Sequence, residues 1–200
     1  MRFRGIYLFI ILIILYPLSV FGQENREKMH VPANEVYERM FSYIKNGEYG
    51  KIRKSLSYIE LITDEINKKY GIQFNKRIEL ALNEKDKKTI EDEIRSVIYF
   101  DIKLNFNECL ELLMLPEKAV VKVKIAAINY SYLSPFIKEQ NPVSDENIKK
   151  LFRRAYKTLN PKSPYIENIT IEKKEPEKIF NEIQDQLFEI MKLEKTFKKQ

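Results

Sequence analysis

The longest uninterrupted helical pattern of the chain is DKKTIEDEIRSVIYFDIKLNFNECLELLMLP, residues 86–116. Its apolar residues recur at steps of three and four, which places them on one face of an α-helix. Asp86 can cap the start of this helix, because its side chain can accept a hydrogen bond from an unpaired backbone N–H. Pro116 lacks the N–H that would continue the helix. We therefore expect one helix from about Asp86 to Leu115.

The next segment, residues 116–140, also predicts a helix. Pro116 suits a first helical turn, and we expect Pro135 to kink or end the helix. The alternation VKVKI at 121–125 is typical of a strand. Because its flanks keep a period of 3.6 residues, we interpret it as helical.

Two further helices are expected toward the C-terminus. Ser144 is a candidate cap for the first, which Asn160 and Pro161 should end. The second follows Pro176 and aligns its apolar residues on one face. The residues between them, at about 160–176, show no helical period and predict a long loop.

The first half of the chain predicts shorter helices separated by glycine. One covers residues 33–46 and stops at Gly47. A second covers 48–70 and closes at Gly71, since glycine readily takes the left-handed conformation that ends many helices. A short helix is expected at 77–83.

The pattern of residues 44–59 recurs at residues 82–97, so that KNGEYGKI answers NEKDKKTI. The helix, tight NGEY turn and second helix resemble the helical hairpin of the tetratricopeptide repeat family over about 30 residues. Repeat stacks normally need three or more units, and only two are found. We therefore expect an all-α, single-domain bundle of six or seven helices built from antiparallel hairpins. A short tetratricopeptide-like helical repeat is the alternative.

The first 22 residues have the layout of a secretory signal peptide. Arg2 and Arg4 precede an apolar stretch, and Val20 and Gly22 form a small-residue cleavage pattern. The apolar stretch, residues 6–21, is a little short of the roughly 18 to 20 residues that span a bilayer. We expect a cleaved signal, with an uncleaved anchor as the alternative.

The expected organisation is a signal at 1–22, a flexible segment at 23–32 and a helical domain at 33–200. The protein should thus be exported to the periplasm or the cell surface. The only cysteine, Cys109, excludes an intrachain disulfide. The net charge of +6 falls to +4 without Arg2 and Arg4. Nucleic acid is not an expected partner of an exported protein.

The chemistry that most enzymes need is missing from the sequence. His30 is the single histidine and Cys109 the single cysteine. A Cys-His or Ser-His-Asp arrangement is therefore implausible, as are a zinc site and a di-iron site. No glycine-rich phosphate loop is present. We expect a protein without catalytic activity or cofactor, although a carboxylate pair acting on a sugar remains the alternative.

Three polar residues, Asp101, Asn105 and Glu108, fall within the apolar stripe of the 86–115 helix. The following helix can offer them partners. In an antiparallel hairpin, Glu108 lies opposite Lys122 to Lys124, and Asp101 lies opposite Asn129 to Ser131. Within these ranges we expect Lys124 to pair with Glu108, and Tyr130 or Ser131 to lie near Asp101. Burying an unpaired carboxylate is costly. We therefore predict a buried polar network that comprises Asp101, Asn105, Glu108, Lys124, Tyr130 and Ser131.

The alternative is a cavity lined by Asp101, Asn105 and Glu108, which would carry a small polar ligand or a hard cation such as Ca²⁺ or Mn²⁺. Calcium takes about 6 to 8 oxygen ligands, and one helix supplies about half of them. This metal hypothesis is therefore disfavoured. Cys109, beside the cluster, is expected to be an inert core thiol.

The helix after Ser144 has a wide basic flank. A solvated face is the simplest interpretation. The functional interpretation is docking on an envelope protein or on an anionic membrane surface. We thus expect an exported binding module, with the ligand or cation carrier as the alternative. The candidate docking face comprises Lys149, Lys150, Arg153, Arg154 and Lys157.

Overall fold

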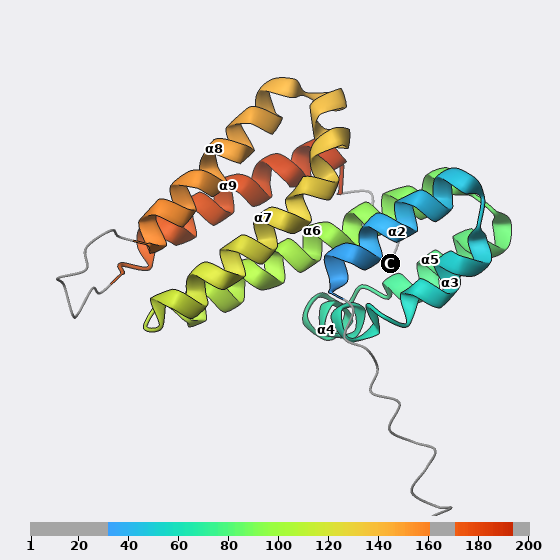
Figure 1. Ribbon diagram of the computed structural model, residues 1–200, viewed down its shortest axis with the longest axis horizontal. Coiled ribbons are helices and arrows are strands. Elements are labelled where there is room, and N and C mark those ends of the chain that lie inside the picture. The colour runs from blue at the N-terminus through green and yellow to red at the C-terminus, as the bar shows by residue number, and fades with distance from the viewer. Residues whose placement is uncertain (1–31, 161–170, 194–200) are drawn as a thin grey trace, which may run out of the picture. The chain divides into compact units, whose positions relative to one another are not determined.

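The computed structural model describes residues 32–160 and 171–193, which form a single helical bundle (Figure 1). Within these residues there are eight helices and no strand. The all-α prediction is therefore confirmed, while the expected number of six or seven helices is too low. The helices are α2 (Ala33–Asn46), α3 (Tyr49–Leu56), α4 (Glu60–Tyr70), α5 (Phe74–Glu84), α6 (Lys87–Glu111), α7 (Pro116–Gln140), α8 (Pro142–Leu159) and α9 (Lys174–Met191).

Some predictions concern residues that the structure does not describe. The signal at 1–22 lies outside the described residues, as does all but the last residue of the segment 23–32. Most of the loop expected at 160–176 lies outside them too, and α9 already begins at Lys174. In the described part of the chain, no helix has the length and apolarity that crossing a membrane requires.

The extra helix arises because the pattern at 48–70 folds as two helices, α3 and α4. The backbone N–H groups of Tyr58 and Ile59 donate to the carbonyls three residues earlier, which tightens the chain into a turn. Ile59 is fully buried at this turn. At the other end of α4, Gly71 has φ +73° and its N–H donates to the carbonyl of Asn67, so the predicted left-handed cap is confirmed.

The recurring sequence pattern corresponds to a recurring turn. After α2, Gly47 has φ +70° and the N–H of Glu48 donates to the carbonyl of Tyr43 at 2.9 Å. After α5, Lys85 has φ +54° and the N–H of Asp86 donates to the carbonyl of Ala81 at 3.0 Å. Both are left-handed helix C-caps with the same hydrogen bond, 38 positions apart.

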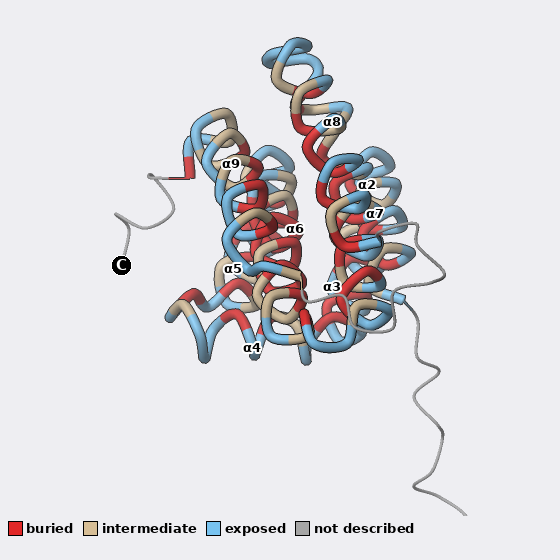
Figure 2. Tube along the Cα trace, turned by 90° about the vertical axis from the view of Figure 1, so that its left-hand side faces the viewer, coloured by how far each residue is buried: buried red, intermediate tan, exposed pale blue. Residues whose placement is uncertain are grey.

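The two hairpins closed by these turns, α2–α3 and α5–α6, do not continue as a stack. The most extensive packing joins α6 to α7, and α8 and α9 pack against this antiparallel pair. Residues 32–160 and 171–193 therefore form a bundle and not a repeat stack. Figure 2 shows the buried residues on the sides of the helices that face one another.

An aromatic cluster joins α6, α8 and α9 in the core. The ring of Phe106 stacks on Phe180 with 4.2 Å between ring centres, and Phe152 lies 5.7 Å from Phe106. Phe106 and Phe180 are almost completely buried. This contact fixes the middle of α6 against the C-terminal helices.

Two predicted boundaries are wrong, at the end of α6 and at the start of α8. The first long helix ends at Glu111 and not at Leu115, because residues 112–115 form the turn that leads into α7. Of the two outcomes expected for Pro135, an end of the helix does not occur, because α7 continues to Gln140, the last residue of the predicted segment. Ser144 is not the cap of α8: its own N–H donates to the side chain of Asn141, and Pro142 occupies the first turn.

Candidate functional site

A buried carboxylate, Asp101 of α6, connects three helices. Only 5% of the residue is exposed. Its Oδ2 accepts hydrogen bonds from the hydroxyl of Tyr37 in α2 at 2.8 Å and from Nδ2 of Asn129 in α7 at 2.9 Å. Its Oδ1 accepts from Nδ2 of Asn105, one turn further along α6, at 2.9 Å. Among the residues that the structure describes, no cation pairs with Asp101, so three neutral donors stabilise its charge.

Burial raises the pKa of Asp101 from 3.8 to about 6. The hydrogen bonds from Tyr37, Asn129 and Asn105 oppose this rise, and the negative charge of Glu108 adds to it. Burial also raises the pKa of Tyr37 well above its usual value. The cluster therefore keeps the hydroxyl proton on Tyr37 and holds α2 against the α6–α7 pair.

A second buried carboxylate, Asp145 in the first turn of α8, joins α8 to α7. It accepts hydrogen bonds from Tyr130 at 2.6 Å and from Ser134 at 2.7 Å, both in α7. Lys149, one turn along α8, lies 2.6 Å away. Burial alone raises the pKa of Asp145, but the hydrogen bonds from these three groups outweigh burial and hold it below its usual value.

The predicted pairing of Glu108 with Lys124 is wrong. Glu108 forms its ion pair with Lys122, and each of these side chains is about one-third exposed. Lys124 instead lies over the ring of Tyr156 in α8, 5.5 Å from the ring centre. The reason is geometric, since two residues along a helix turn a side chain by about 200°. Glu108 and Lys124 thus do not belong to the buried network.

The partners predicted for Asp101 are also wrong, although Asp101 and Asn105 do contact each other. Tyr130 donates to Asp145, and the exposed Ser131 donates to the carbonyl of Ile128. The side chains of neighbouring residues on a helix differ in direction by about 100°. Asn129 therefore faces Asp101 of α6, whereas Tyr130 faces Asp145 of α8. Equal distance from the hairpin turn therefore does not make two residues partners.

The geometry does not favour a metal at Asp101, Asn105 and Glu108. The carboxylate oxygens of Asp101 already accept hydrogen bonds, and Glu108 is paired with a lysine. In the described part of the chain, no three His, Cys, Asp or Glu residues are grouped to hold a metal ion. Cys109 is buried, and burial raises the pKa of its thiol to about 12.

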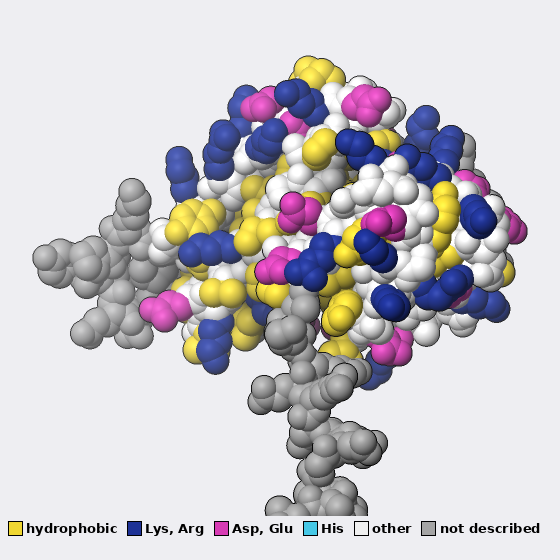
Figure 3. Space-filling view, turned by 45° about the vertical axis from the view of Figure 1, so that its right-hand side comes forward, with side chains coloured by type: hydrophobic (Ala, Val, Ile, Leu, Met, Phe, Trp, Pro, Cys, Tyr) yellow, Lys and Arg dark blue, Asp and Glu magenta, His cyan; other side chains and the backbone are white. Residues whose placement is uncertain are grey.

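The α8 basic face comprises two neutralised and three unneutralised cations. Lys149 pairs with Asp145, and Arg154 pairs with Glu175 of α9. Lys150, Arg153 and Lys157 are exposed, and no described residue forms an ion pair with them. Figure 3 shows Lys and Arg side chains in a row over α8, with hydrophobic side chains beside them.

Beside α8, the outer side of α7 carries exposed apolar residues that we call the α7 apolar stripe. It consists of Val121, Ile125 and Ile128, which are 50%, 37% and 47% exposed. Their spacing of four and three residues places them on one face of the helix. Next to this stripe, a hollow of about 320 Å³ lies between the start of α7 and the end of α8. The α7–α8 hollow is lined by Pro116, Glu117, Val120, Lys124, Tyr156, Leu159 and Asn160.

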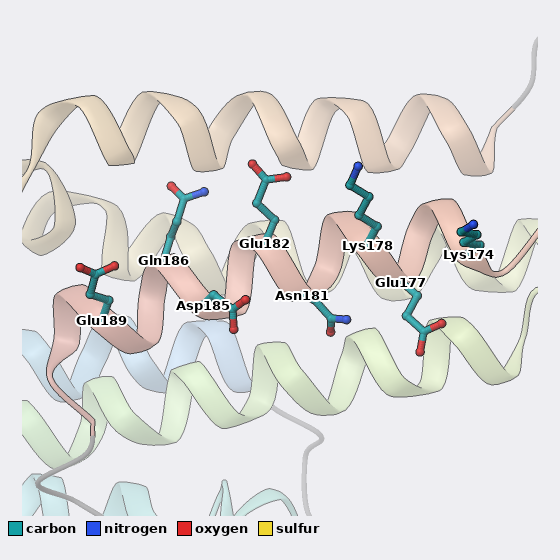
Figure 4. A pocket seen from close by; sticks show the side chains of 8 residues that line it. All are labelled: Lys174, Glu177, Lys178, Asn181, Glu182, Asp185, Gln186 and Glu189. Carbon is teal, nitrogen blue, oxygen red and sulfur yellow. The ribbon is translucent and has the colours of Figure 1, made fainter.

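The exposed face of α9 has the opposite character. Figure 4 shows its polar side chains spreading from a single helix toward α8 on one side and toward α6 on the other. Four carboxylates and two lysines lie on this face, and all of the residues that line the depression belong to α9. Acidic side chains on one exposed helix face do not define a cation site, because they cannot surround an ion. The lining residues are Lys174, Glu177, Lys178, Asn181, Glu182, Asp185, Gln186 and Glu189.

No protein-family model, curated protein or solved structure matches the chain.

Sequence reasoning missed Tyr37 and Asp145 as organising polar residues, and from the range facing Asp101 it chose Tyr130 or Ser131 where the partner is Asn129. Tyr37 is 64 positions from Asp101, and its spacing within α2 is that of an ordinary core residue. Asp145 was visible only as an acidic residue in a first helical turn. The α7 apolar stripe did leave a signal, because Val121, Ile125 and Ile128 make α7 apolar on the side away from its core face as well.

Proposed function

We propose that the protein is an exported, non-catalytic interaction module of the cell envelope, which docks an acidic partner on the α8 basic face. The observation that carries this proposal is the set of three exposed cations, Lys150, Arg153 and Lys157, with which no described residue pairs. Cations concentrated on one side of a helix attract an anionic surface and raise its rate of association.

The buried polar groups support an interaction module over an enzyme. Asp101 and Asp145 are each held by three side chains and connect helices, so both carboxylates have structural partners. A general acid or base must reach a substrate proton. Export rests on the signal pattern at residues 1–22, and a place in the periplasm or on the cell surface follows from it.

The partner can be an acidic envelope protein or an anionic membrane surface, and both depend on the same cations. The test is the charge-reversal variant Lys150→Glu/Arg153→Glu/Lys157→Glu. Its matched control is Lys54→Glu/Lys76→Glu/Lys87→Glu, which changes the net charge equally at exposed lysines of α3, α5 and α6.

Two measurements apply to these variants: cosedimentation with vesicles of phosphatidylglycerol and phosphatidylcholine, and titration with an acidic helical peptide. We expect the charge-reversal variant to lose binding to at least one of these probes by about tenfold or more, while the control stays within about twofold of wild type. Equal loss in both variants, or no loss in either, would show that the α8 basic face is not a docking site.

A further inference from the structure

We propose that the α7 apolar stripe and the α7–α8 hollow seat an amphipathic, acidic helix of a partner protein. This inference rests on the proposed function and names the class of partner. An amphipathic helix in a groove binds through apolar anchors spaced three and four residues apart. Val121, Ile125 and Ile128 offer the complementary spacing along α7.

The stripe lies between the two sides of α7 that already have partners. On one side, Lys124 and Ser134 contact Tyr156 and Asp145 of α8. On the other side, Lys122 and Asn129 contact Glu108 and Asp101 of α6. The side chains of the stripe point outward between these two sides of α7. From Val121 to Ile128 it extends about 10 Å, or about two helical turns. A helix lying along α7 can therefore cover it.

The α7–α8 hollow can accept one large apolar side chain of the partner. Its walls include Val120 of α7 together with Tyr156 and Leu159 of α8, and its volume is about 320 Å³. Interfaces obtain most of their binding energy from a few anchors that enter such hollows. Lys124 also lines the hollow, so a carboxylate beside the anchor would meet a cation.

Charge complementarity sets the acidic character of the partner. On α8, Arg153 and Asn160 lie within about 60° of Tyr156, so they face the same side as the hollow. Arg153 and Lys157 are exposed and have no ion-pair partner among the described residues. A helix whose apolar face lies on the stripe thus places its flanking residues near Lys124 and Arg153, which select Glu and Asp.

The exposed fractions favour a protein helix over a membrane. The three stripe residues are only about half exposed, while Met114 in the α6–α7 turn is 83% exposed. A lipid surface is entered by protruding apolar residues, whereas recessed residues are reached by the side chains of a partner. A second copy of the chain, docked by the same face, would bring two basic faces together, and like charges oppose this contact.

The test uses the full chain and a fluorescent probe peptide of about 18 residues, long enough to form helix, with leucines at helical spacing and glutamates elsewhere. A scrambled peptide of the same composition is the peptide control. The stripe variant is Ile125→Ser/Ile128→Ser. Its matched control, Leu61→Ser/Val143→Ser, removes apolar residues that are 84% and 77% exposed at other places. Fluorescence anisotropy gives the Kd for each pair.

We expect the probe to bind wild type at least about tenfold more tightly than the scrambled peptide does. We also expect the stripe variant to weaken probe binding about tenfold, with little change in its matched control. Equal binding of the two peptides, or an unchanged Kd in the stripe variant, overturns the helix-docking inference. If charge reversal on α8 still weakens binding in that case, the proposed function stands without the inference.

Two other occupants of the stripe have their own signatures. If the stripe variant loses vesicle binding but keeps probe binding, the occupant is a lipid surface and the inference is wrong. If sedimentation equilibrium shows a wild-type dimer that the stripe variant abolishes, the occupant is a second copy, and the inference is again wrong. The proposed function itself fails if charge reversal on α8 changes the binding of neither peptide nor vesicles.

Discussion

Replacing Asp101 by asparagine should remove a large pH dependence from the stability of the fold. Asp101 is buried, has no cation beside it among the described residues, and has a pKa of about 6 in the folded state, against 3.8 for an exposed carboxyl. One pKa unit corresponds to about 1.4 kcal/mol. Ionising Asp101 in the folded protein therefore costs about 3 kcal/mol of unfolding free energy.

The direction of the effect follows from proton linkage. The folded state holds the Asp101 proton more tightly than the unfolded state, so this group favours folding most at a pH below its unfolded pKa. The contribution is lost as the pH rises from about 4 through the folded pKa of about 6, and it changes little above about pH 7. The amide of the variant does not titrate. The difference in unfolding free energy between wild type and Asp101→Asn should hence shift by about 3 kcal/mol across this range.

The assay is urea unfolding, followed by far-ultraviolet circular dichroism, at several values between about pH 4 and pH 7.5. Taking the difference between the two proteins cancels the titration of the other carboxyl groups. The asparagine side chain has only one acceptor oxygen, so the hydrogen bond from Nδ2 of Asn105 to Oδ1 is lost. This loss lowers the unfolding free energy of the variant by about 1 to 2 kcal/mol at every pH and does not change the pH dependence of the difference. A difference that is constant from about pH 4 to pH 7.5 would mean that Asp101 titrates as an exposed carboxyl and that its burial does not raise its pKa.

Three other substitutions test the packing. Lys85→Gly should raise the unfolding free energy by about 1 kcal/mol, since Lys85 has φ +54°, which favours glycine. Gly47→Ala should lower the unfolding free energy by about the same amount through its φ of +70° alone, because an added Cβ meets no atom within 4 Å. Effects of the same sign in chemical unfolding would contradict this. Phe106→Ala should cost about 3 to 5 kcal/mol, since it empties the space against Phe180, and a loss under about 1 kcal/mol would show that the stack is not formed. Cys109 should react with a disulfide reagent at neutral pH only as fast as the protein unfolds, because its thiol is buried and has a pKa of about 12; rapid labelling of the native protein would contradict its burial.

The helices that begin or end at a strong local signal were predictable. Residues 33–46 form α2 as expected, Gly71 ends α4, and Pro116 starts α7. Each signal acts through the backbone of a few neighbouring residues, so it needs no knowledge of the fold. The break between α3 and α4 was missed because Ile59 continues the helical spacing across the turn and is buried there.

The polar contacts were harder to predict because they depend on direction as well as position. The hairpin prediction placed Glu108 at the right height on its helix, but Lys122 and not Lys124 faces it. For Asp101 the missing element was α2, whose Tyr37 reaches the carboxylate from outside the hairpin. A helix such as α7, which contacts α2, α6, α8 and α9, divides its side chains among several neighbours, and its sequence alone does not assign them.

The proposed docking surface for an acidic helix is formed by α7 and α8 together. The most direct measurement is NMR mapping of the full chain with the acidic amphipathic peptide and with its scrambled control. We predict that the amphipathic peptide shifts backbone amide signals of residues 116–132 and 149–160 selectively, and that the scrambled peptide shifts them far less. Shifts concentrated on other helices, or identical shifts with both peptides, would show that α7 and α8 do not dock an acidic helix.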